Sequence, residues 1–153
     1  MLYDTFFLML ECARAFQVVR IALKQHKGNW MGNEAERIQA ELIAKEESLL
    51  ENSTRNAPRR VAELLDDSCV DFETSGKRSV YRRGDRLENA DGVLYIDSAS
   101  VSSMSLSEDC ILLLYIGVKV NKNVRIKSNC SSIWKRSEGQ WKMAFHQGTP
   151  IPE

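Results

Sequence analysis

The chain has 153 residues, of which 43% are hydrophobic and 27% charged. This length fits one domain that buries roughly 68–70% of its unfolded surface, so the core needs no disulfide or metal support. The ordinary composition excludes collagen-like, low-complexity and wholly disordered chains. The 21 basic residues balance 21 acidic ones. With no basic excess or stripe, we expect no nucleic-acid partner.

The cysteines and the N-terminus indicate a cytoplasmic protein. Cysteines occur at positions 12, 69, 110 and 130, with no C-x-x-C pair, and there are only two histidines. Zinc sites usually need closely spaced ligand pairs, so we expect reduced thiols, no metal and no cofactor. The apolar run over 6–10 has no basic segment before it, and a membrane span needs about 20 residues. We therefore expect no signal peptide and no membrane contact.

Apolar spacing predicts three helices before residue 66. The first covers 2–25 and ends before Lys27-Gly28-Asn29. The second starts at an N-x-x-E capping box, Asn33 to Glu36, and runs to about 51. The third opens at Pro58 and runs to about 65. We expect residues 1–30 to be an N-terminal extension, possible as an extra packed helix or as a leader before Met31, and 31–153 to be the domain.

From residue 69 the hydrophobic period changes to the alternation of strands. The expected strands cover 69–73, 80–81, 93–105, 110–120, 125–136 and 140–147, with a polar helical turn in 82–91. Helices followed by antiparallel strands are typical of the α+β class.

A hairpin tip at Glu138-Gly139 sets the register of the last two strands. One predicted face carries Cys130, Ser132, Trp134, Trp141, Met143 and Phe145. The opposite face carries Ser131, Ile133, Ala144 and His146. The same register places Lys135 opposite Lys142, which costs some stability.

The strand over 110–120 is apolar on both faces, whereas the helices over 33–65 can cover only one. We expect the other face to form a homodimer, because a monomer would expose an apolar patch. The residues expected on this outer face are Ile111, Leu113, Tyr115, Ile133 and Ala144. The helix predicted over 2–25 is the alternative cover within one chain.

The common catalytic motifs G-x-S-x-G, G-x-x-x-x-G-K-[ST], G-x-G-x-x-G and H-E-x-x-H are absent. A more specific signal is the C-terminal tract, with S-S-x-W over 131–134 and W-x-x-x-F-H-Q-G-T-P over 141–150. Upstream, E-L-L at 63–65 precedes V-D-F at 70–72 and S-G at 75–76. Over about 38–150 the chain resembles the nuclear-transport-factor-2-like superfamily, and within it the small bacterial SnoaL-like proteins of unknown function.

The resemblance implies a strongly curved antiparallel sheet wrapped around N-terminal helices, forming a cone with an apolar pocket. The superfamily includes ketosteroid isomerases, polyketide cyclases, dehydratases and non-catalytic binding modules, so the fold does not decide the function. Departures from the family pattern include Asp71 for the usual Glu and Cys130 for the usual Arg. They lie around the expected pocket mouth, so no ligand is carried over from relatives.

Two residues are candidates for acid–base chemistry. His146 is the residue type that titrates near neutral pH, but the register places it with Ile133 and Ala144, away from the aromatic face, unless a bulge intervenes. Asp71 would be a carboxylate base, but Val70 and Phe72 are the apolar pair of its strand, which turns Asp71 away from the core. Structural roles are therefore favoured for both.

Six side chains are predicted to line the pocket, some of them supplying hydroxyl groups: Tyr81, Tyr115, Ser132, Trp134, Met143 and Phe145. The favoured function is a non-catalytic module that binds a small hydrophobic molecule, because no complete catalytic set is visible. One alternative is an acid–base isomerase, cyclase or dehydratase with a hydrophobic substrate. The other is a structural or interaction protein whose pocket is filled by side chains.

Overall fold

The computed structural model describes residues 32–152, with only the backbone of Gly32 and Asn33. Its contacts divide the chain into two units, Met1–Glu36 and Arg37–Glu153, and all the strands belong to the second. The helix predicted over 2–25 and the side chain of the capping residue Asn33 lie outside the described residues.

The described helices are α2 (Gly32–Leu50), α3 (Asn52–Arg55) and α4 (Pro58–Leu64). The two longer ones confirm the predicted helices, while α3 is an additional turn between them. Pro58 starts α4, where its missing N–H costs no hydrogen bond. Residues 82–91 form turns and irregular chain instead of the predicted helical turn. No helix within residues 32–152 is long and apolar enough to cross a membrane.

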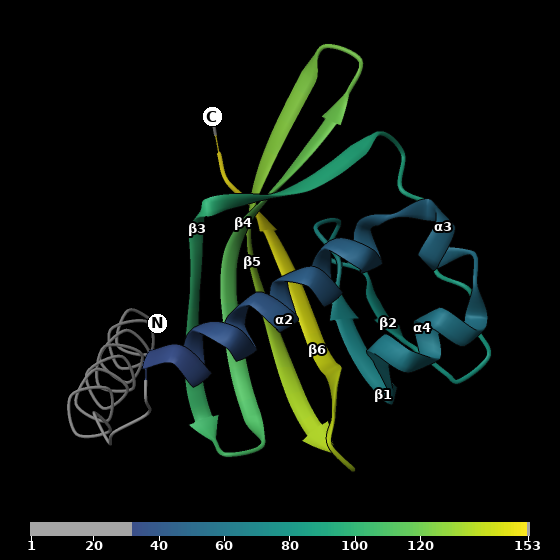
Figure 1. The fold of residues 1–153 in the computed structure, drawn as a ribbon. Helices are drawn as coiled ribbons and strands as arrows, with labels where there is room; N and C mark the ends of the chain where they lie inside the picture. Colours follow the sequence, from purple (N-terminus) through teal and green to yellow (C-terminus); the bar gives the residue numbers. More distant parts are fainter. Residues whose placement is uncertain (1–31, 153) are drawn as a thin grey trace, which may run out of the picture. The chain divides into compact units, whose positions relative to one another are not determined.

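Six strands form one sheet in the order β2-β1-β6-β5-β4-β3. Their bounds are Leu65–Phe72 for β1, Arg78–Val80 for β2, Val93–Ser107 for β3, Cys110–Asn121 for β4, Val124–Ser137 for β5 and Gln140–Pro150 for β6. The α+β class is confirmed. The sheet is mixed, however, because β1 pairs with β6 in parallel, and it is not strongly curled, in contrast to the predicted antiparallel cone. In Figure 1 the helices of the second unit lie over one face of this sheet.

The helix-covered face of β4 is the opposite of the one predicted. Ile111, Leu113 and Tyr115 were expected on the outer face, but they are buried in the core with the helices. Leu112 and Leu114 point the other way and keep part of their surface exposed. Periodicity identified the two faces of β4 correctly but did not show which one the helices cover.

A β-bulge in β6 explains a second difference. Pairing with β5 runs Trp134 to Met143 and then Ile133 to Phe145, so Ala144 is an extra residue. Beyond this bulge every side chain of β6 lies on the face opposite to the predicted one. Phe145 therefore shares the outer face with Ile133, while His146 pairs with Ser132 on the helix-covered face.

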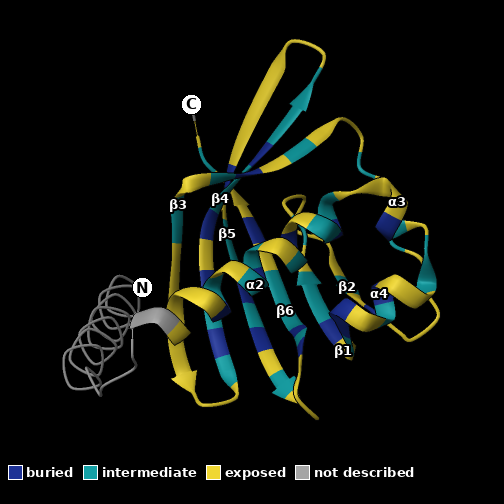
Figure 2. Cartoon of the chain, viewed as in Figure 1, coloured by how far each residue is buried: buried dark blue, intermediate teal, exposed yellow. Residues whose placement is uncertain are grey.

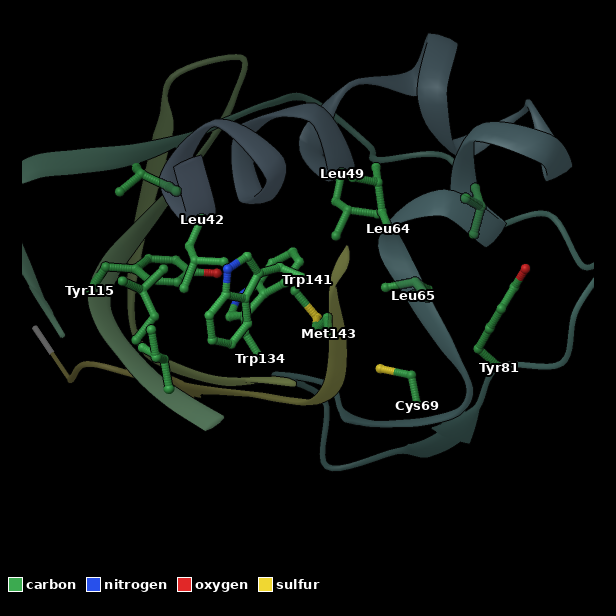
Figure 3. Close-up of a cluster of buried hydrophobic side chains, with 14 of the residues drawn as sticks. Leu42, Leu49, Leu64, Leu65, Cys69, Tyr81, Tyr115, Trp134, Trp141 and Met143 are labelled. Atoms are coloured by element: carbon green, nitrogen blue, oxygen red, sulfur yellow. The ribbon is translucent and has the colours of Figure 1, made fainter. Parts of the chain in front are cut away.

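The core lies between α2, α4 and the covered face of the sheet. Leu42 and Leu49 of α2 meet Trp134, Trp141 and other side chains of the central strands (Figure 3). Figure 2 shows buried and exposed positions alternating along the strands, as expected for a sheet covered on one face. Trp134 has no exposed surface and is the largest fully buried side chain among residues 34–152.

Replacing Trp134 by Ala should lower the free energy of unfolding by about 3–5 kcal/mol, because the large void cannot collapse completely. Urea unfolding followed by circular dichroism measures this change. Val80→Ala is the control: Val80 is 42% exposed, so its loss should cost less than about 0.5 kcal/mol. Equal effects of the two substitutions would contradict the central position of Trp134.

Candidate functional site

The bulge at Ala144 brings together the two residues considered for acid–base chemistry. Asp71 of β1 is the parallel partner of His146 in β6. The His146 Nδ1 atom lies 2.8 Å from Asp71 Oδ1, and the side chains are 26% and 40% exposed. Val70 and Phe72, expected to face the core, lie on the outer face, where Phe72 is 39% exposed. The predicted separation of Asp71 and His146 from the helix-covered face is therefore wrong.

The other ring nitrogen of His146 contacts a side chain in the interior. His146 Nε2 lies 3.3 Å from the hydroxyl of Tyr115, which is buried on β4. The Tyr115 hydroxyl in turn donates to Glu46 Oε2 over 3.0 Å. A hydrogen-bonded chain thus runs from the partly exposed Asp71 to a carboxyl group beneath α2.

Glu46 is the centre of this network and is only 2% exposed. Its Oε1 atom accepts hydrogen bonds from the Ser132 hydroxyl and from Trp134 Nε1, the latter over 3.1 Å. Trp134 Nε1 also lies 3.1 Å from Ser132 Oγ. An indole N–H can only donate, so the acceptors here are the carboxyl and the hydroxyl oxygens. All the polar groups around Glu46 are therefore satisfied by one another.

The surroundings shift the titration of all three inner groups. Burial raises the pKa of Glu46, while the charge of His146 and the three donors oppose that rise. Burial and the adjacent Glu46 raise the pKa of Tyr115 well above its usual value. Burial works against a charged His146, but hydrogen bonds to Asp71 and Cys130 and the charges of Glu46 and Asp71 raise its pKa to about 10. At neutral pH His146 is therefore a cation that donates from both nitrogens.

The predicted pocket residues fall into three groups. Tyr115, Ser132 and Trp134 belong to the Glu46 network. Met143 is buried in the core beside them, and Tyr81 is buried near Cys69 with a hydroxyl that has no partner within the described chain. Figure 3 shows Tyr81 at the far end of the cluster from Tyr115. Phe145 lies outside, edge-on to Phe72 with ring centroids 5.6 Å apart.

Sequence reasoning missed Glu46, although a signal for it exists. The apolar stripe of α2 contains Ile38, Leu42 and Leu49, and Glu46 occupies the position that continues it. A carboxylate on the buried side of an amphipathic helix needs partners in the core. That irregularity in the stripe was the available indication of a buried polar site.

A hollow of about 300 Å³ opens between the β1–β2 turn and the end of β6. Its lining consists of Phe72, Glu73, Thr74, Gly76, Gln147, Gly148, Thr149 and Pro150. Gly148, which lines the hollow, follows His146 by two residues in β6 and lies on the same face of the strand. Within the described part of the chain, no group of three or more His, Cys, Asp or Glu side chains could hold a metal ion.

The pH dependence of stability tests the His146 contacts. A folded-state pKa of about 10, against about 6.5 in the unfolded chain, means that the contribution is complete below pH 6.5 and disappears as the pH rises through 10. The difference in unfolding free energy between the wild type and His146→Gln should therefore shrink between pH 6.5 and 10. NMR titration of His146 should give a midpoint near 10, and Asp71→Asn should lower it. A wild-type midpoint at or below 6.5 would contradict the network.

Comparisons with known proteins give information on the fold. Neither a protein-family model nor a curated protein matches the sequence. An NTF2-like protein of unknown function from Pseudomonas putida is similar in structure, with a TM-score of 0.59 and 12% identity over 81% of this chain and 92% of that one. The association domain of C. elegans CaMKII has a TM-score of 0.55 and 17% identity, over 76% of this chain and 98% of the domain.

A third similar structure, from Parabacteroides distasonis, is described as a candidate ketosteroid isomerase. It has a TM-score of 0.52 and 19% identity over 71% of this chain and 84% of its own. These identities are too low to transfer an activity, and the three proteins have different descriptions. The helices packed on a six-stranded mixed sheet have the NTF2-like, or cystatin-like, α+β fold.

Proposed function

We propose that this protein is a non-catalytic module that binds a small molecule in the hollow between the β1–β2 turn and the end of β6. The volume of about 300 Å³ lies at the lower end of the range for small-molecule sites. The hollow is open to solvent, and a ligand can enter it without unpacking the core.

The observation that carries this proposal is that the polar groups of the Glu46 network already have hydrogen-bond partners among themselves. A general acid or base must come within hydrogen-bond reach of its substrate. Ser132 and Trp134 have no exposed surface, and Tyr115 is 5% exposed. Because Glu46 already accepts from all three, displacing them would leave a buried carboxyl unpaired. Binding at the adjoining hollow requires no such change.

The lining favours a neutral ligand with one apolar face and several hydrogen-bonding groups. Phe72 offers a partly exposed ring, whereas Thr74, Gln147 and Thr149 offer hydroxyl and amide groups. The one charged residue of the lining, Glu73, forms an ion pair of 3.4 Å with Lys77. The hollow therefore has little net charge with which to select an ion.

A thermal-shift screen of neutral metabolites tests the proposal, because a ligand at 100 times its Kd stabilises the folded state by about 2.7 kcal/mol. For the strongest hit, Gln147→Ala combined with Thr149→Val should raise the Kd at least about tenfold in calorimetry, since each substitution removes a hydrogen-bonding group, worth about 1 kcal/mol. Ser137→Ala, an exposed hydroxyl outside the hollow, should leave it unchanged. A screen without hits, or an unchanged Kd in the double variant, would contradict binding at this place.

A second function, self-association through the outer sheet face, has separate support. One row of apolar side chains crosses five strands by direct pairing: Met104, Leu112, Ile133, Phe145 and Val70. All five retain partial exposure, and Leu114 beside them is 37% exposed. We infer that a second copy covers this row, since contiguous, partly exposed apolar side chains on one sheet face are typical of interfaces. The similar C. elegans domain is an association domain, which fits the inference.

This outer row replaces the predicted surface, of which Ile111, Leu113 and Tyr115 are in the core. Sedimentation equilibrium at micromolar concentration should give twice the chain mass of 17.4 kDa. Ile133→Asp should shift the protein to the monomer, because the charge would be buried unpaired in the interface. Val124→Asp is the matched control, since Val124 is 57% exposed and lies outside the row. A wild-type monomer would exclude the dimer.

A further inference from the structure

We propose that the hairpin end, defined as residues 119–127 of β4 and β5 together with Val93 of β3, docks on the surface of an anionic lipid bilayer. The hairpin end includes no residue of the hollow or of the outer apolar row, so this inference is independent of the functions proposed above.

The hairpin end projects from the rest of the sheet. β4 and β5 pair as far as Asn121 and Val124, whereas β6 pairs with β5 only as far as Ser128. In Figure 1 these two strands extend away from the helices of the second unit. Residues 122–127 are all exposed, and Figure 2 shows this side of the hairpin in the colour of exposed residues. A flat partner can therefore meet the hairpin end without moving any other element.

The charge of the hairpin end has one sign, although the basic and acidic residues of the whole chain balance. Residues 118–128 contain no Asp or Glu and four basic residues, which are Lys119, Lys122, Arg125 and Lys127. Within residues 34–152 none of the four forms an ion pair. The acidic side chain beside the tip, Asp91, accepts a hydrogen bond from Asn121 over 2.8 Å. The four positive charges are thus available to an anionic surface.

Exposed apolar side chains accompany this charge. Of the eight exposed large apolar side chains within residues 34–152, four lie at this end of the sheet: Val93, Tyr95, Val124 and Ile126. Val93 is 65% exposed, Val124 57% and Ile126 46%. At a bilayer surface, such side chains enter the boundary between headgroups and acyl chains, while the long stems of Lys and Arg let their charges remain among the headgroups. The two contributions add, so a small surface is sufficient for binding.

The apolar groups favour a bilayer over a nucleic acid as the anionic partner. Proteins that bind single strands usually stack bases on aromatic rings. The exposed aromatic residue here is Tyr95, and Arg125 already lies over its ring, 5.8 Å from the centroid, and donates to its hydroxyl over 2.7 Å. Val124 and Ile126 offer no flat ring to a base. The expectation of no membrane contact considered only segments that span a bilayer, which docking at its surface does not require.

Co-sedimentation of the full chain with lipid vesicles tests the proposal. The protein should bind vesicles of one part phosphatidylserine to two parts phosphatidylcholine, and should not bind phosphatidylcholine alone. Binding should be lost at a salt concentration of about 1 M, where the screening length falls to about 3 Å. Lys122→Glu combined with Lys127→Glu should lower the partition coefficient at least about 25-fold, because each basic residue near such a surface contributes about fivefold. Val124→Ser combined with Ile126→Ser should lower it about tenfold through the lost apolar burial.

Two control variants carry the same chemical changes elsewhere. Leu106→Ser removes a side chain that is 50% exposed at the opposite end of the β3–β4 pair. Arg59→Glu combined with Arg60→Glu reverses two exposed charges on α4. Both should bind as the wild type does, and circular dichroism checks that every variant is folded.

Three results would overturn the proposal. One is a wild-type protein that does not bind the phosphatidylserine vesicles or binds phosphatidylcholine alone equally well. Another is an equal loss of binding in the hairpin variants and their controls. The third is an unchanged partition coefficient for the Val124 and Ile126 double variant together with tighter binding to poly(U) RNA than to vesicles, which would assign the hairpin end to a nucleic acid instead.

Discussion

The burial of the Glu46 carboxyl is the constraint on which the arrangement of the interior depends. An unpaired carboxyl at this depth would cost several kcal/mol, so the sheet must present donors opposite this turn of α2. Ser132 and Trp134 of β5 and Tyr115 of β4 supply them, and each is fixed by its place in the strand register. The network therefore specifies both the position of α2 over the sheet and its rotation about its own axis.

The bulge at Ala144 extends this network to solvent. One additional residue in β6 changes the side on which His146 lies and places it between Asp71 and Tyr115. The hydrogen bonds of His146, with Asp71 first, and the charges of Glu46 and Asp71 raise its pKa although the ring is partly buried. Such re-aiming of a side chain is a common use of bulges next to functional sites.

Within the described residues, the hydrogen bonds of the Glu46 network close the interior, and the two proposed functions use surfaces outside it. Aromatic side chains that could line a pocket instead fill the core, and polar groups that could act on a substrate bind one another. The open places are the hollow at the end of β6 and the apolar row on the outer sheet face.

Periodicity in the sequence was sufficient to predict α2, α4, the four long strands and the α+β class, because hydrophobic spacing reports which residues of each element are buried. The Lys135–Lys142 pairing was also predicted correctly, since a two-residue hairpin tip fixes the nearby register. Three features required the tertiary structure. The covered face of β4 depends on where the helices pack, the parallel pairing of β1 with β6 joins segments far apart in the chain, and the bulge adds one residue without a local signal. The contact of Asp71 with His146 depends on the last two, so only the folded chain could reveal it.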